Sequence, residues 1–231
     1  MSVDGSVVAA RLAQVREEVA EAARRAGRAP QDVELLAATK YVDAADLPAL
    51  HAAGIRLVGE NRSDALLAKQ AEHQDLFTWD FIGHLQSRKV RDVVGRVRLI
   101  HAIDSDSACE QLQRRSDRPV ACLLEVNVAG EGSKAGVPRD GIDAFLEAVE
   151  PLDRVRFEGL MTMPPLAAEP EGSRPAFAAL RELADLVAGR WDGRHSFGRL
   201  SMGTSQDYLV AVEEGATIVR LGSTLYGRPG L

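Results

Sequence analysis

A lysine at the end of a short apolar segment is the residue whose type and position most suggest chemistry. Lys40 ends the run Val33-Glu-Leu-Leu-Ala-Ala-Thr-Lys40, which has the pattern of a buried strand, and helix-forming residues follow from Asp43. Proteins that alternate strands and helices keep their reacting groups at the carboxyl ends of the strands. An amine held there away from water loses its proton near neutral pH and attacks a carbonyl. A single strand-end lysine more often extends to solvent, so the interpretation depends on the rest of the chain.

Two segments rich in glycine and hydroxyl residues form a second chemical pattern. They are residues 201–205, Ser-Met-Gly-Thr-Ser, and residues 222–224, Gly-Ser-Thr. Glycines let backbone N–H groups approach an anion, and hydroxyls add donors. Arg220 shares a strand face with Gly222 and offers a guanidinium that can pair with phosphate. Because barrel enzymes commonly bind phosphate on the loops after strands seven and eight, the two segments together predict a phosphate site, although either alone would be an ordinary turn.

The elements that position these residues follow one repeated pattern, in which strands alternate with helices. Apolar residues at helical spacing predict a leading helix over 6–26, which Gly27 ends. Short strand-like runs then alternate with helix-like segments, as parallel pairing requires. We therefore expect a single-domain α/β protein over residues 1–231, a (β/α)8 TIM barrel with an extra N-terminal helix; an open doubly wound sheet is the second choice. The expected strands are 33–39, 55–60, 77–83, 98–103, 120–128, 156–163, 199–203 and 217–223, and the expected helices lie near 46–53, 63–73, 86–94, 105–116, 138–149, 174–188 and 206–214.

Composition excludes several classes of protein. The chain has 231 residues, 45% of them hydrophobic, and a net charge of -6, which argues against general binding to nucleic acid or an anionic membrane. No uncharged run approaches the roughly 20 residues of a membrane span, and no signal peptide is evident. Cys109 and Cys122 lack metal-site spacing, which is typical of reduced, mostly buried thiols in a cytosolic protein. We expect a cytoplasmic location.

Polar residues recur at the carboxyl ends of several predicted strands. Asn61 follows the second strand and His84 the third, where we expect it to touch a ligand. His101 is expected to be a hydrogen-bonded core residue, and His195 has no identifiable role. No histidine and carboxylate pair has metal-ligand spacing, so no metal site is predicted. A Schiff-base lysine opposite a phosphate site suits pyridoxal 5′-phosphate (PLP) or a phosphorylated sugar, as in lysine-dependent aldolases, and the order of residues leaves both open.

Several blocks of sequence resemble one known family. The chain is similar to the pyridoxal phosphate homeostasis proteins, single-domain relatives of the alanine racemase barrel, from about residue 6 to Gly227. The blocks occur in the family's order and spacing, which makes the resemblance specific. They are Ala38-Thr-Lys40, Gly59-Glu-Asn61, Phe81-Ile-Gly-His-Leu-Gln86, Gly159-Leu-Met-Thr-Met163, Leu200-Ser-Met-Gly203 and Val219-Arg-Leu-Gly-Ser-Thr224.

The resemblance implies a cofactor and the residues that hold it. It implies a barrel that carries PLP as an internal aldimine on Lys40, with Asn61 and His84 flanking the ring. Met202 and Thr204 belong to the same site block, in which Thr204 replaces the family's usual methionine. The residues implied to hold the phosphate are Ser201, Gly203, Arg220, Gly222 and Ser223.

The resemblance also implies a role in keeping free PLP low and in buffering or delivering it, without established catalytic turnover. Partners are then PLP and apo-forms of PLP-dependent enzymes, and we expect a monomer or weak dimer. A racemase of this lineage needs a second acid/base group from a separate β-domain; because the chain ends at Leu231, we expect that domain to be absent. Tyr41 is the nearest substitute and is expected to pack locally. The alternative is a minimal PLP-dependent racemase or a Schiff-base aldolase. Weak side activity towards amino acids, from the intrinsic reactivity of PLP, is compatible with this role.

A glycine-rich loop after the fifth strand carries another lysine. Residues 130–136, Gly-Glu-Gly-Ser-Lys-Ala-Gly, present Lys134 between glycines, and the family also has a lysine in this block. A solvated loop lysine is the simpler interpretation. The alternative hypothesis is that Lys134 assists the loading or release of PLP.

Overall fold

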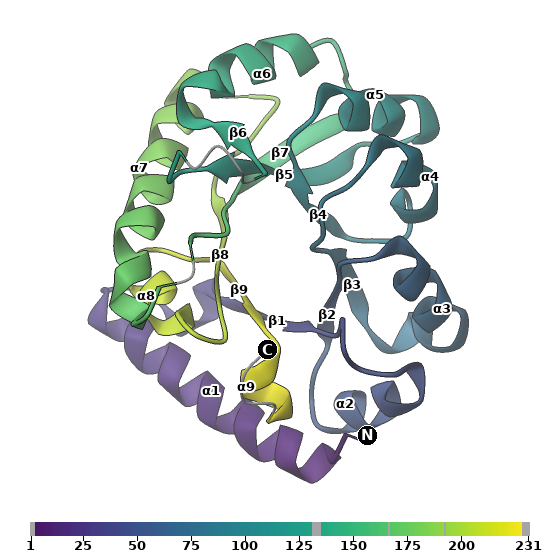
Figure 1. Ribbon diagram of the computed structural model, residues 1–231, viewed down its shortest axis with the longest axis vertical. Helices are drawn as coiled ribbons and strands as arrows, with labels where there is room; N and C mark the ends of the chain where they lie inside the picture. Colours follow the sequence, from purple (N-terminus) through teal and green to yellow (C-terminus); the bar gives the residue numbers. More distant parts are fainter. Residues whose placement is uncertain (1–2, 131–134, 166, 192, 228–231) are drawn as a thin grey trace.

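The computed structural model describes residues 3–130, 135–165, 167–191 and 193–227, and within them eight parallel strands close into a barrel (Figure 1). The strands follow the chain order around the barrel, and pairing of β1 with β9 and of β4 with β5 completes the ring. A short additional strand, β6 (Val137–Pro138), pairs with β5 outside the ring. The barrel strands are β1 (Glu34–Ala38), β2 (Leu57–Glu60), β3 (Thr78–Phe81), β4 (Leu99–Ile103), β5 (Val120–Asn127), β7 (Val155–Met161), β8 (Arg199–Thr204) and β9 (Ile218–Leu221).

Helices surround the barrel (Figure 1). The leading helix α1 (Gly5–Arg25) begins at Asp4, whose carboxylate accepts N–H bonds from the first turn, and it packs against α2, α8 and α9. The predicted (β/α)8 barrel with an extra N-terminal helix is confirmed. The helix expected near 86–94 is divided between a 3-10 turn, Ser87–Lys89, and one turn of α-helix, Val90–Val93. The remaining helices are α2 (Leu47–Ala52), α3 (Ser63–His73), α4 (Val90–Val93), α5 (Asp106–Arg115), α6 (Ile142–Val149), α7 (Arg174–Arg190), α8 (Tyr208–Glu213) and α9 (Ser223–Tyr226).

Strand alternation divides the apolar residues between two cores. The larger core lies between the strands and the helices and includes Ala37, Met202 and Leu221. The smaller one fills the barrel and includes Leu36 and Ile218. Since successive side chains of a strand point to opposite faces, one face of each strand packs on helices and the other lines the interior. The same alternation decides which strand-end residues face the mouth of the barrel.

The described helices include none that is long and apolar enough to cross a membrane. Cys109 and Cys122 are free and buried, as the sequence predicted. Burial raises the pKa of the Cys109 thiol to about 12, so this thiol stays protonated near neutral pH and is a poor nucleophile.

His195 has no role predicted from the sequence, and in the structure it supports an irregular part of β7. Its Nδ1 accepts the backbone N–H of Phe157 at 3.2 Å, and its ring packs against the rings of Phe157 and Phe197. The pairing of β5 with β7 shifts register just beyond Phe157. The histidine therefore satisfies a buried backbone donor where the strand departs from regular pairing.

Replacement of His195 by asparagine is expected to flatten the acid dependence of stability. Burial, with help from Arg194 and Arg156, lowers the pKa of His195 from 6.5 to about 4. The unfolded chain thus binds the proton more readily, and stability is lost as pH falls from about 6.5 towards 4. In His195→Asn the amide oxygen keeps the acceptor but cannot ionise. Urea unfolding at pH 7 and pH 5 should show a smaller difference in the variant; an equal difference would contradict this role.

Candidate functional site

Lys40 lies just beyond the carboxyl end of β1, at the mouth of the barrel. Its side chain is exposed, and its Nζ sits 4.9 Å from the ring centroid of Tyr41, over the ring. Continued alternation from Leu36, which faces the barrel interior, puts Lys40 on the interior side. Tyr41 itself is 51% exposed. The lysine is therefore accessible to a ligand, and the local packing expected of Tyr41 is a cation–π contact with Lys40.

A buried ion pair holds the backbone directly before Lys40. Lys69 of α3 donates to the carboxylate of Glu60, at the end of β2, and to the carbonyl oxygen of Thr39 at 2.8 Å. The Thr39 hydroxyl donates to the same Glu60 oxygen at 2.7 Å. All three residues are at most 6% exposed. The pair thus fixes the peptide that leads into Lys40, a role that sequence reasoning missed although Glu60 lies in one of the family-like blocks.

Two further polar atoms are buried beside this ion pair. The hydroxyl of Tyr226, in α9, and the second carboxylate oxygen of Glu60 have no hydrogen-bond partner among the described residues. Burial, and the charge of Glu60, raise the pKa of Tyr226 well above its ordinary value. Buried groups of this kind are usually satisfied by ordered water or a ligand. The region behind Lys40 therefore keeps unused hydrogen-bonding capacity.

Arg220 carries a buried positive charge in the barrel interior. Its guanidinium donates to the carbonyl oxygen and the hydroxyl of Ser201 and, at 3.0 Å, to the carbonyl oxygen of Thr162. No carboxylate of the described chain lies within ion-pairing distance, and burial lowers its pKa to about 10. A buried cation without a carboxylate partner favours an anionic or acceptor ligand. The guanidinium lies in the barrel interior, and its contact with a phosphate stays a prediction.

Ser201 connects Arg220 to a histidine. The Ser201 hydroxyl, which accepts from Arg220, lies 2.8 Å from Nδ1 of His101 and is fully buried. Nε2 carries the proton because it faces the Asp80 carboxylate, which can only accept. Burial keeps the ring neutral, so Nδ1 accepts the hydrogen bond that the Ser201 hydroxyl donates. The serine thus positions Arg220, and the phosphate contact implied for Ser201 stays a prediction.

The interior network continues to the amino end of the barrel. His101, from β4, donates to Asp80 of β3 across 3.1 Å, and Arg98 binds both oxygens of that carboxylate. Arg98 also pairs with Glu34 at the start of β1, which meets Arg199 at 3.2 Å. Burial lowers the pKa of His101, and although burial alone would raise the pKa of Asp80, its hydrogen bonds hold it below the ordinary value. His101 is thus the hydrogen-bonded core residue that the sequence predicted.

The two glycine and hydroxyl segments meet, as expected. The Ser205 hydroxyl accepts the backbone N–H groups of Gly222 (3.1 Å) and Thr224 (3.2 Å), and the Thr224 hydroxyl donates to the carbonyl oxygen of Ser205. Pairing of Leu36 with Arg220 sets Gly222 beside the strand that ends near Lys40. The backbone donors expected at an anion site are therefore present and face a hydroxyl oxygen. Ser205 belongs to the predicted segment 201–205 but not to the residues that the resemblance implies, and its hydroxyl accepts both donors.

The other residues of these two segments differ in burial and in hydrogen-bond partners. Thr204 donates its backbone N–H and its hydroxyl to the carboxylate of Asp207. Met202 is fully buried in the outer core, so the contact predicted for it is open only to its backbone. Ser223 is half-buried at the start of α9. Among the residues implied to hold the phosphate, Gly203, Gly222 and Ser223 have positions compatible with that role.

Gly203 sets the path of the first segment, and replacing it with alanine is expected to weaken phosphate binding and stability. Its φ is +88°, and a Cβ atom there would lie 2.5 Å from the Cβ of Ala211. The strained backbone alone costs about 1–3 kcal/mol. Gly198→Ala is the matched control, because a Cβ there meets nothing within 4 Å. Urea unfolding and PLP titration should distinguish the two variants; equal behaviour would show that the conformation of Gly203 is unimportant.

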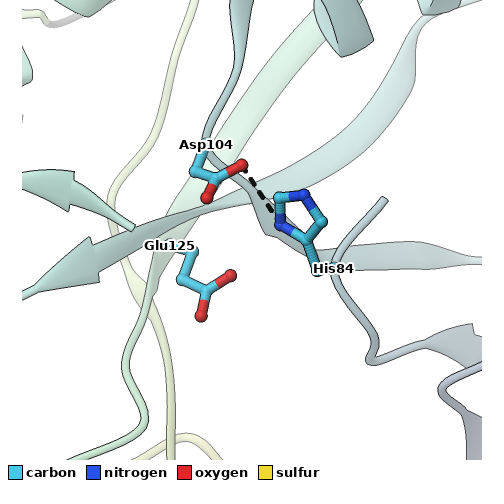
Figure 2. Close-up of side chains that lie close together, drawn as sticks. All are labelled: His84, Asp104 and Glu125. Atoms are coloured by element: carbon cyan, nitrogen blue, oxygen red, sulfur yellow. Dashed lines mark ion pairs between the residues drawn. The ribbon is translucent and has the colours of Figure 1, made fainter. Parts of the chain in front are cut away.

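Asn61 and His84 line one pocket at the mouth, as expected for residues on neighbouring strand ends. Gly83 makes this possible, since a Cβ there would lie 2.2 Å from the carbonyl oxygen of Asn61. His84 also meets two carboxylates (Figure 2). Its Nδ1 is 3.3 Å from an Asp104 oxygen, and Glu125 lies beside the pair. Lys134, for which a loading role was the alternative, lies outside the described residues.

Fold and site together define a barrel protein with an accessible lysine at the end of its first strand and backbone donors beyond its last two. The family model for the alanine racemase N-terminal domain matches residues 10–229. The pyridoxal phosphate homeostasis protein of Pseudomonas aeruginosa is 40% identical over 96% of this chain and 96% of its own length, and that of Aquifex aeolicus is 39% identical over 94% and 96%. The chain belongs to the pyridoxal phosphate homeostasis protein family, which confirms the resemblance seen in the sequence.

Solved structures agree with this assignment. The structure of PipY from Synechococcus elongatus with PLP bound has a TM-score of 0.82 and 34% identity, and the match covers 95% of this chain and 100% of PipY. A lysine/ornithine decarboxylase from Vibrio vulnificus shares the barrel at a TM-score of 0.68 but only 15% identity, over 62% of its own chain. The second likeness concerns the fold alone.

Proposed function

We propose that this protein binds PLP through Lys40 and holds the cofactor in order to buffer or deliver it, without catalytic turnover. The observation that carries the proposal is the accessible Lys40 at the end of β1 together with a buried Arg220 on the neighbouring strand β9. Among the described residues, Arg220 has no carboxylate partner. PLP supplies an aldehyde that condenses with an amine, together with a phosphate and a ring acceptor. A strand-end lysine, a buried guanidinium and the backbone N–H groups of Gly222 and Thr224 suit those three groups.

Different residues of the chain would bind different groups of PLP. Lys40 provides the amine, and the Glu60–Lys69 pair fixes the backbone before it. The N–H groups of Gly222 and Thr224, now facing the Ser205 hydroxyl, offer donors to a phosphate with Gly203 and Ser223 beside them. Arg220, held by Ser201, presents its charge from within the barrel. Asn61 and His84 form the opposite side of the mouth.

The proposal that the protein is a carrier agrees with the relatives that match it almost from end to end, which bear the homeostasis name. The alternative is a PLP-dependent racemase or a lysine-type aldolase. We further propose a monomer or weak dimer that receives PLP in the cytoplasm and passes it to apo-enzymes. Light scattering at two protein concentrations tests the oligomeric state.

The deciding experiment combines a spectrum with a turnover assay. Purified protein is incubated with PLP, dialysed, and examined for a visible band at one equivalent of cofactor. The loaded protein is then offered amino acids, phosphorylated ketoses and, separately, an apo-form of a PLP-dependent enzyme. Stoichiometric PLP with reactivation of the apo-enzyme and no turnover is the expected result. Turnover of amino acids would show that the protein is an enzyme and not a carrier. Turnover of phosphorylated ketoses without PLP would indicate an aldolase.

A further inference from the structure

The carboxyl ends of three neighbouring strands bring together one imidazole and two carboxylates. His84 follows β3, Asp104 follows β4 and Glu125 lies in β5 (Figure 2). One donor atom from each lies within 4.8 Å of the others. Figure 2 shows the His84 ring turned with Nδ1 towards Asp104, and the Glu125 carboxylate beside them. The cluster thus gathers nitrogen and oxygen donors from three separate parts of the chain at one place.

The charge at this place is poorly compensated. Among the described residues, neither Asp104 nor Glu125 has a lysine or arginine within ion-pairing distance, and Arg220 acts on Glu125 only from further away. Glu125 is 8% exposed, and one of its carboxylate oxygens is buried with no hydrogen-bond partner among the described residues. A buried carboxylate of this kind requires a cation or another partner. This orphaned oxygen is an observation independent of the spacing of the cluster.

The geometry points to a divalent-cation site formed by His84, Asp104 and Glu125, and we propose that it takes a transition-metal ion of the Zn²⁺ or Mn²⁺ type. One nitrogen and two oxygen ligands suit these borderline ions. Ligands about 2.1 Å from a metal lie roughly 3–3.5 Å apart, and the 3.3 Å between His84 and Asp104 already meets that condition. Rotation of the Glu125 side chain brings in the third ligand, and water completes the coordination.

Backbone contacts orient the acidic ligand. The second oxygen of Asp104 accepts the N–H of Gly136 at 3.0 Å, which leaves the first oxygen directed at His84. Gly136 is fixed in turn, because its φ is +107° and a Cβ atom there would lie 2.7 Å from the backbone nitrogen of Asn127. Outer contacts of this kind orient metal ligands and contribute to affinity. The site is thus held by the loop between β5 and β6 as well as by the strands.

Metal binding by PLP-free protein tests the proposal separately from cofactor binding. Protein stripped with EDTA is dialysed to equilibrium against Zn²⁺ or Mn²⁺, and bound metal is measured. We expect one saturable equivalent in the wild type. In Asp104→Asn and Glu125→Gln the affinity should fall by at least the roughly 10–100-fold that an outer contact contributes. Asp92→Asn is the matched control and should bind like the wild type, because this carboxylate pairs with Lys89 and is not one of the three ligands.

A measurement on the wild type avoids reliance on variants that fold poorly. Addition of Zn²⁺ should shift the imidazole NMR signals of His84 and leave those of His51 unchanged. Binding of less than one equivalent at millimolar metal, equal affinity in all variants, or an unchanged His84 signal would each overturn the proposal. The visible band of bound PLP, recorded on the same variants, reports on the proposed function by itself.

Discussion

Replacement of Lys40 by alanine is expected to abolish the visible absorption band that PLP gives on the wild-type protein. The lysine is the accessible amine at the mouth, and no covalent link to that position forms without it. Because the side chain is exposed and its contact within the described residues is with the Tyr41 ring, the free energy of unfolding should change little. Absorption spectra before and after borohydride reduction, followed by peptide mapping, measure both the band and the site of attachment.

The matched control for this variant is Lys89→Ala. Lys89 lies at the same mouth, lines the pocket of Asn61 and His84, and has a side chain that is 44% exposed. It should keep one equivalent of covalent PLP. A band that survives in Lys40→Ala, or that disappears in both variants, would show that attachment depends on another residue or on the general charge of the mouth.

Replacement of Lys69 by methionine is expected to be the most destabilising change at the site. It leaves the Glu60 carboxylate buried without its cation and removes the donor from the carbonyl oxygen of Thr39. Loss of one partner from a buried pair costs about 3–5 kcal/mol. Because Thr39 precedes Lys40, PLP should also load more slowly. Urea unfolding gives the change in free energy, and the growth of the visible band gives the loading rate.

A double variant separates the unpaired charge from lost packing. Lys69→Met combined with Glu60→Gln removes both charges. The amide oxygen of the glutamine can still accept the hydrogen bond that the Thr39 hydroxyl donates. It should be more stable than Lys69→Met alone, since the penalty arises from the unpaired carboxylate. Arg62→Ala, which breaks an exposed ion pair with Asp64 nearby, should show no measurable loss. Equal losses in Lys69→Met and Arg62→Ala would show that burial gives the Glu60–Lys69 pair no special importance.

The sequence alone determined the architecture and the principal positions of the site. Alternation of short apolar runs with helical spacing is a local property, so the barrel strands and the leading helix were predicted within a few residues. Lys40 and the segments around Gly203 and Gly222 were found because strand ends and glycine-rich turns are visible in the order of residues. The family-like blocks added Asn61 and His84. These are features that neighbouring residues encode.

Only the tertiary structure decided how side chains from different strands combine. Alternation shows that Ser201 and Met202 face opposite ways but not which one faces inward; closure of the barrel settles this, and turns Ser201 to Arg220 and Met202 to the outer core. The pair of Glu60 with Lys69, and the cluster of His84 with two carboxylates, join separate segments. Such contacts depend on strand register and helix packing, which no local pattern specifies.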